Sequence, residues 1–106
     1  MSEFIIVKAE LTIYPTEQGG RELPIISGYR PNHVFEYSDN GQSVRTFIGD
    51  VNFEQAFFYP GETNEVFVRF LKVKELKPLI LIGKTWFLQE GKIKVGKAII
   101  QNLIEE

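Results

Sequence analysis

Few residues of this chain have the types and spacing that catalysis or metal binding requires. His33 is the single histidine and cysteine is absent. A Ser/His/Asp triad would have to use that one residue, and a Cys/His pair or a multi-histidine metal site is excluded. The 14 Asp and Glu residues fall on expected turns or outward strand positions, and no pair stands out as a general acid and base. The sequence therefore predicts a protein that is not an enzyme and needs no metal or cofactor.

One triplet, Gly83-Lys84-Thr85, mimics the end of a phosphate-binding P-loop, GxxxxGK[ST]. The first glycine of that motif would fall on Pro78, and the residues from Leu79 to Ile82 read as a strand rather than as a flexible cradle. We therefore expect no nucleotide site and no hydrolysis of GTP.

Two arginines are the best candidates for binding an anion. Arg21 and Arg30 flank the stretch GGRELPIISGYRP, which is rich in glycine and proline, and a guanidinium presents a planar fork that suits phosphate or carboxylate. The alternative, which we favour, is structural: they bond loop carbonyls or acidic neighbours such as Glu22, because buried carbonyls need partners. Tyr29 is expected to pack against the end of the fold rather than to recognise a base.

Charge is unevenly distributed along the chain. The formal net charge is −2, so contact with nucleic acid or an anionic membrane would need a local patch. Residues 1–66 hold four basic and ten acidic residues, whereas residues 67–106 hold eight and four. Lys92 and Lys94 share one side of the expected last hairpin, and Lys72 and Lys74 share one side of their expected strand. Such a basic stripe would suit an RNA backbone, although a solvated face is the favoured interpretation.

Alternating polar and apolar residues predict short strands along the whole chain. The pattern is clearest where Ala9, Leu11 and Ile13 share one face. The expected strands cover residues 4–14, 34–37, 44–48, 65–70, 79–88 with an interruption near Gly83, and 93–103. Residues 49–59 fit either a short strand or a loop whose aromatic side chains plug the end of a barrel.

Turn residues separate these strands, with the clearest signals at Gly41, Gly61 and Gly91. No apolar pattern persists at helical spacing for three turns, so the chain is expected to be all-β. Its 106 residues fit one domain, spanning residues 1–106. Regularly spaced short strands favour a closed barrel, which removes exposed sheet edges.

The sequence has none of the features of a secreted or membrane-spanning protein. The first residues lack a basic region, a long apolar core and a cleavage site. An apolar run such as Leu79 to Ile82 is far shorter than the roughly 20 residues that span a bilayer. The absence of cysteine is compatible with a reducing compartment. We therefore expect a cytoplasmic protein without membrane contact, and the polar end Glu105-Glu106 favours an intact short gene product over a fragment.

Three stretches, taken in order, resemble the C-terminal domain of translation elongation factor Tu, often called domain III. The segment GGRELPIISGYRP matches that family's GGR, short apolar and GYRP pattern, and follows a similar strand, AELTIY. Pro60, Gly61 and the acidic residue after them lead into an alternating strand. Residues 87–99, FLQEGKIKVGKAI, are similar to the last hairpin of the family. The matches span about residues 7–103, and residues 38–59 match poorly.

This resemblance implies a six-stranded antiparallel β-barrel of Greek-key type. In the family the barrel lies beside a GTPase domain and a second barrel, and it helps to bind the T stem of aminoacyl-tRNA and partner proteins. Gly91 and Asn32 remain at positions that face the tRNA in the family. However, Glu22 stands where histidine is usual and would repel a phosphate, and Ile93 stands where arginine is usual.

Together these features favour a stand-alone, non-catalytic barrel that binds a protein partner and has a translation-related role. An outward Phe67 with several loop aromatics would form an apolar contact patch. The alternative is binding to tRNA or ribosomal RNA through the basic stripe, with an affinity that falls steeply with salt. The predicted interaction surface comprises Arg21, Tyr29, Arg30, Asn32, Phe67, Gly91, Lys92 and Lys94.

Overall fold

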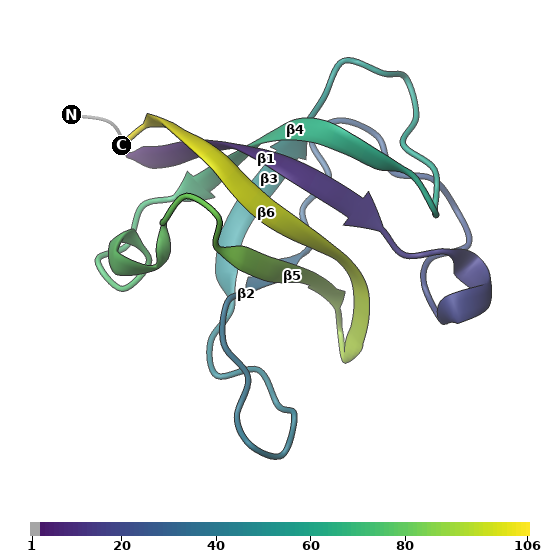
Figure 1. The fold of residues 1–106 in the computed structure, drawn as a ribbon, viewed down its shortest axis with the longest axis horizontal. Coiled ribbons are helices and arrows are strands. Elements are labelled where there is room, and N and C mark those ends of the chain that lie inside the picture. Colours follow the sequence, from purple (N-terminus) through teal and green to yellow (C-terminus); the bar gives the residue numbers. More distant parts are fainter. Residues whose placement is uncertain (1–2) are drawn as a thin grey trace.

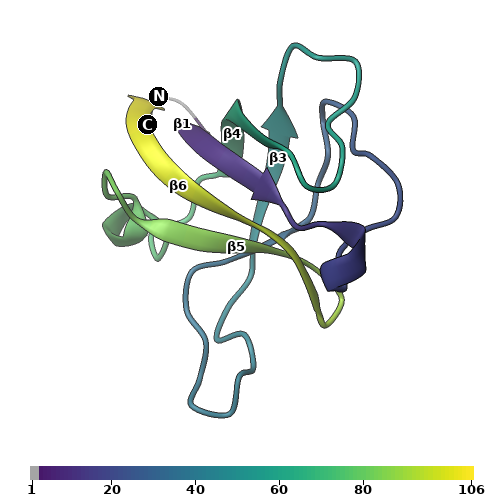
Figure 2. The ribbon, with the colours of Figure 1, turned by 45° about the vertical axis from the view of Figure 1, so that its right-hand side comes forward.

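The computed structural model describes residues 3–106, which form an all-β fold. Six strands close into an antiparallel barrel in the order β1-β4-β3-β2-β5-β6, with β6 pairing back onto β1 (Figures 1 and 2). The elements are β1 (Phe4–Ile13), η1 (Thr16–Gln18), β2 (Asn32–Val34), β3 (Phe47–Asn52), β4 (Thr63–Leu71), η2 (Lys77–Leu79), β5 (Thr85–Glu90) and β6 (Ile93–Glu105), η being a 3₁₀ helix. Because β2, β3 and β4 are neighbours in sequence and space while β1 lies beside β4, the topology is of Greek-key type. The predicted fold class is confirmed.

The first predicted strand is confirmed almost to the residue. Along β1 every second side chain, from Ile5 to Ile13, is buried inside the barrel, as the alternation of the sequence requires. On β6 the alternation shifts at Gly96, where a side chain would not fit. A Cβ added there would lie 2.6 Å from the carbonyl oxygen of Thr12, so glycine permits the close approach of β6 to β1.

The predicted strand over residues 79–84 is wrong. This segment forms the end of η2 and a turn, and β5 begins only at Thr85. Pro78 lies in the first turn of η2, where its missing N–H suits a helical start. Leu81 and Ile82 are 60% and 74% exposed, whereas Leu79 and Ile80 are partly buried against the core, so the run does not alternate as a strand would. No helix among residues 3–106 is long and apolar enough to cross a membrane.

The predicted hairpin around Gly41 exists, but its strands differ from the prediction. The regular pairing of β2 ends at Val34, and β3 begins at Phe47 rather than at residue 44. His33, Val34 and Phe35 are all buried, and three consecutive buried side chains break the alternation of a regular strand. Residues 35–46 therefore form an irregular hairpin.

The ambiguous segment 49–59 contains both a strand and a plug. Strand β3 continues to Asn52, and the loop that follows carries Phe58, which is completely buried. Its ring packs edge to face against Phe53 at 5.6 Å between centroids. The interpretation of a loop whose aromatic side chain plugs the barrel is confirmed for Phe58.

The connections gather at the two ends of the barrel. One end, which we call the loop end, carries residues 14–31, residues 53–62 and the β5–β6 turn at Gly91; the opposite end carries residues 72–84 and the base of the 35–46 hairpin. The tip of this hairpin reaches back along β5 to the β5–β6 turn. Lys72 and Lys74 follow the last residue of β4, so the prediction that they share one side of a strand is wrong. They lie at the opposite end from Lys92, and the two lysine pairs do not form one continuous stripe.

Candidate interaction surface

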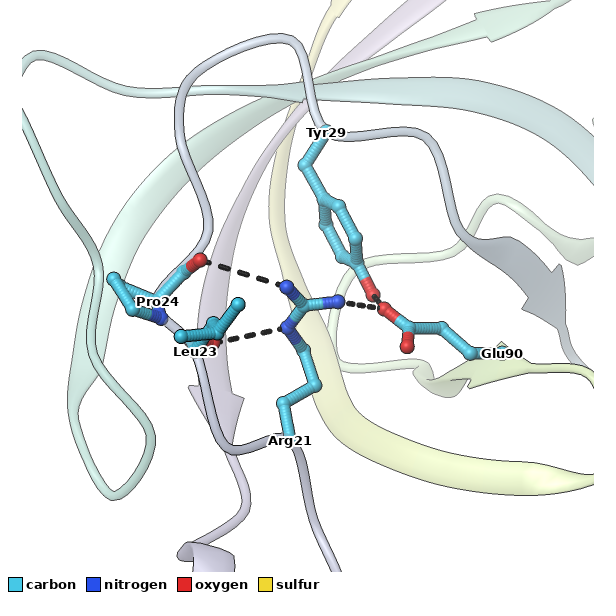
Figure 3. Close-up of polar contacts among 5 residues, drawn as sticks. All are labelled: Arg21, Leu23, Pro24, Tyr29 and Glu90. Atoms are coloured by element: carbon cyan, nitrogen blue, oxygen red, sulfur yellow. Dashed lines mark hydrogen bonds and ion pairs between the residues drawn. The ribbon is translucent and has the colours of Figure 1, made fainter.

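Arg21 fastens the long loop of the loop end to the β5–β6 hairpin. Its Nε donates a hydrogen bond to the carbonyl oxygen of Leu23 at 3.1 Å, and Nη2 donates to that of Pro24 at 3.5 Å. Its Nη1 forms an ion pair with Glu90 (Figure 3). The structural interpretation of Arg21 is therefore confirmed, but the acidic partner is Glu90 on β5 instead of the neighbouring Glu22.

Tyr29 completes this cluster from the other end of the loop. Its hydroxyl donates a hydrogen bond to the same Glu90 oxygen that receives Arg21 (Figure 3). The guanidinium of Arg21 lies 5.2 Å from the centre of the Tyr29 ring. Burial raises the pKa of Tyr29 well above its usual value, and the hydrogen bond and charge of Glu90 add to this effect against the opposing charge of Arg21. The ring packs against the core, as predicted.

We expect Glu90→Gln to loosen this cluster, whereas Glu22→Gln leaves it intact. Loss of the charged acceptor should reduce the free energy of unfolding by about 1–2 kcal/mol, because the pair is partly exposed. The pKa of Tyr29 should fall but stay above its usual value, since burial persists. Chemical denaturation and a ¹³C NMR titration of the tyrosine Cζ measure both effects. Equal results for the two variants would show that Glu90 does not hold the loop.

An exposed apolar surface lies on the two segments that this cluster supports. Ile25 and Phe58 exchange backbone hydrogen bonds of 2.9 and 3.0 Å across an antiparallel bridge, and both side chains point into the core. Neighbouring side chains face solvent. We call these the apolar ribbon patch: Leu23, Ile26, Phe57 and Tyr59, which are 70%, 61%, 50% and 50% exposed.

The sequence predicted that loop aromatics join Phe67 in an apolar contact patch, but it did not indicate which aromatics face outward. Phe57, Phe58 and Tyr59 form an aromatic run in a segment predicted as either strand or loop. A bridge at the middle residue places its two neighbours on the opposite, outward face. In the folded chain the rings of Phe57 and Tyr59 lie 6.0 Å apart between centroids.

The predicted Lys92 and Lys94 line a groove of about 420 Å³ between the β5–β6 turn and the tip of the 35–46 hairpin. The ammonium group of Lys94 lies 4.1 Å from the ring centre of Tyr37 and 4.8 Å from that of Phe87, so two cation–π contacts already hold it. Lys92 lies on the turn and is exposed.

The groove floor is organised by hydrogen bonds. Gln89, which lines the groove, accepts a hydrogen bond of 2.8 Å from the Tyr37 hydroxyl and donates one of 2.8 Å to the carbonyl oxygen of Gly91. Gly91 has φ +57°, a left-handed conformation that favours glycine in such a turn. The predicted Gly91 therefore has a structural role in the turn that presents Lys92.

The remaining predicted residues lie on the outer wall of the barrel. Phe67 points outward from β4 and is 46% exposed, as predicted. Asn32 is exposed on β2, and Arg30 is exposed in the segment just before it. The eight predicted residues thus do not form one site, because some of them lie at the loop end and the others lie on the outer wall. Within residues 3–106, no three His, Asp or Glu side chains gather closely enough to hold a metal ion.

No protein-family model matches the chain. The fold and the surfaces above therefore define its class, an antiparallel six-stranded barrel with apolar and basic surfaces at one end, and the resemblance to elongation factor Tu domain III stays a prediction.

Proposed function

We propose that this protein is a non-catalytic binding module, a stand-alone barrel of the elongation factor Tu domain III kind, which contacts a protein partner in the cytoplasm in a translation-related role. The observation that carries the proposal is the apolar ribbon patch, where four large apolar side chains are at least half exposed on two adjoining segments. Contiguous apolar surface rimmed by polar residues is characteristic of protein–protein contact sites.

The patch is held in place before any partner arrives. The bridge between Ile25 and Phe58 fixes the two segments to each other. The contacts of Arg21 fix the beginning of the loop to β5. Binding to a preorganised surface avoids the entropy cost of ordering a loop, and aromatic residues such as Phe57 and Tyr59 are enriched in interface cores.

The structure also supports the proposed relation to elongation factor Tu. Two of the three stretches that carry the resemblance, GGRELPIISGYRP and FLQEGKIKVGKAI, contact each other through Arg21, Tyr29 and Glu90. Residues that are 61 and 69 positions apart thus belong to one anchoring cluster. A shared barrel would explain why both stretches occur together and in this order.

Contact with tRNA or ribosomal RNA is a second candidate function. It is favoured by the groove at the β5–β6 turn, whose lining includes Lys92 and Lys94 and no acidic side chain. A phosphate group would suit such a lining. The separation of Lys72 and Lys74 from this groove limits the footprint to one end of the barrel.

Affinity capture from the native organism tests these functions. The wild-type chain is compared with Leu23→Ser/Phe57→Ser, which removes half of the patch, and with Leu81→Ser/Ile82→Ser as a matched control at the opposite end of the barrel. We expect the same proteins to be recovered with the wild-type and control chains. The patch variant should recover them about 10-fold less efficiently, which corresponds to about 1.4 kcal/mol of binding free energy.

Capture is repeated after nuclease treatment to separate the two candidates. Partners that persist after nuclease and depend on the patch support the protein-binding function. Partners that disappear with nuclease, together with tRNA binding that weakens steeply as salt rises, would instead favour RNA. Equal recovery by the patch variant and its control would contradict the role of the patch.

A further inference from the structure

A lateral row of charged side chains crosses the outer wall of the barrel. Asp50 on β3 lies opposite Arg69 on β4. On its other side, the bridge between Tyr29 and Val51 continues the register of β2 with β3 and places Arg30 opposite Asp50. One carboxylate therefore lies between two guanidinium groups.

Both carboxylate oxygens of Asp50 accept hydrogen bonds from side chains other than Arg30. Its Oδ2 accepts a hydrogen bond of 2.9 Å from Nη2 of Arg69, and its Oδ1 accepts one of 2.7 Å from Nδ2 of Asn52. Arg69 also lies 4.6 Å above the ring of Phe4. Burial alone would raise the pKa of Asp50, but these hydrogen bonds and the charges of Arg69 and Arg30 together lower it. Asp50 is therefore a stable anion that is already committed to Arg69 and Asn52.

The guanidinium donors of Arg30 bind no other residue within 3–106. Arg30 is exposed and makes no hydrogen bond or ion pair with another of the described residues. It lines a groove of about 270 Å³ whose wall includes Phe4, Ile48 and Leu71. Ile48 and Leu71 are 57% and 41% exposed, and the ion pair of Asp50 with Arg69 completes the lining. The groove therefore joins an apolar surface to a guanidinium that makes no ion pair within residues 3–106.

The strand register sets the spacing between these two features. Ile48 is two residues before Asp50, and the pairing of Gly49 with Phe70 places Ile48 beside Leu71. The apolar pair Ile48 and Leu71 therefore lies two residues along the strand, about 6.6 Å, from the charged row that holds Arg30. In an extended peptide, side chains at positions i and i+2 point to the same side with the same spacing.

We propose that this groove binds an extended segment of a partner protein in which an acidic side chain and an apolar side chain are two residues apart. The carboxylate binds the fork of Arg30, and the apolar side chain lies on Ile48 and Leu71. This inference goes beyond the proposed function, because the groove is on the outer wall and is separate from the apolar ribbon patch, and because it specifies the chemistry of the ligand.

Two capped heptapeptides, Ac-GSLTESG-NH₂ and Ac-GSETLSG-NH₂, test both chain directions. Each is titrated into the ¹⁵N-labelled full chain at millimolar concentration, and amide shifts are recorded by NMR. We expect at least one peptide to give saturable shifts at Ile48, Gly49 and Leu71. Replacing its glutamate by glutamine, or its leucine by serine, should weaken binding about 10-fold.

Variants of the protein complete the test. Arg30→Gln should weaken binding about 10-fold, whereas Lys97→Gln, which removes one positive charge on the exposed side of β6, should leave the affinity within about 2-fold. The inference is overturned if neither peptide binds, if Arg30→Gln binds as tightly as the wild type, or if inorganic phosphate alone reproduces the shifts. None of these outcomes depends on whether the apolar ribbon patch recruits a partner.

Discussion

Replacing Phe58 by alanine is expected to lower the free energy of unfolding by about 3–5 kcal/mol, although the residue lies in a loop between β3 and β4. Its ring is fully buried among core side chains and packs against Phe53. Truncation would leave a cavity at the loop end and would also weaken the bridge to Ile25. Denaturation with urea, followed by the fluorescence of the single tryptophan, measures the loss.

Phe57→Ala is the matched control for this prediction. Phe57 is adjacent in sequence and half exposed, so its truncation should change the free energy of unfolding by no more than about 0.5 kcal/mol. Phe58→Leu, which keeps most of the buried volume, should lie between the two at about 1 kcal/mol. If Phe57→Ala and Phe58→Ala lower the free energy of unfolding equally, the assignment of Phe58 to the core and of Phe57 to the surface is incorrect.

Acidification from about pH 7 to about pH 5 is expected to destabilise the protein by about 2 kcal/mol through His33 alone. The imidazole is completely buried. Burial lowers the pKa of His33 from 6.5 to about 4, against the opposing effects of its hydrogen bond to Gly49 and the charge of Asp50. Because the unfolded chain takes up the proton near pH 6.5 and the folded chain does not, stability falls as the pH drops from 6.5 towards 4.

The hydrogen bonds of His33 explain why the folded state excludes that proton. Trp86 donates its indole N–H to Nδ1 of His33 at 3.0 Å, and an indole can only donate. The neutral ring therefore carries its proton on Nε2, which donates to the carbonyl oxygen of Gly49 at 3.0 Å. A second proton would have to enter at Nδ1 and would break the bond to Trp86.

His33→Gln provides the control, because an amide has one acceptor and one donor group and does not titrate in this range. Since His33 is the single histidine, the wild type should lose about 2 kcal/mol more than the variant between pH 7 and pH 5. Urea denaturation at several pH values gives the two slopes. Parallel slopes would mean that His33 is not the source of the acid sensitivity.

The sequence was most informative where structure depends on neighbouring residues. The alternation along β1 and β4 and the turns at Gly41, Gly61 and Gly91 are local patterns, and each is present in the fold. The same reasoning failed for residues 79–84, because periodicity does not distinguish a short buried strand from an apolar turn of which only one half packs against the core. Pro78 and Gly83 were the local signals for the turn.

Candidate residues could be chosen from the sequence, but their partners could not. Arg21 was predicted to bond within its loop and Tyr29 to pack against the end of the fold, as observed. Glu90, which joins them, is 69 and 61 residues away. Likewise, Nδ1 of His33 accepts its hydrogen bond from Trp86, which is 53 residues distant. Such pairs arise from the order and register of strands around the barrel.

The sequence by itself therefore determined an all-β chain, its approximate strands and turns, and the small set of residues able to do chemistry, because these depend on residue type and local spacing. Only the tertiary structure decided that Arg21 binds loop carbonyls and Glu90, whereas Arg30 makes no hydrogen bond or ion pair with another of residues 3–106. The two arginines are nine positions apart in one stretch. They differ because barrel closure places Glu90 beside Arg21, whereas Asp50, which lies beside Arg30, already binds Arg69 and Asn52.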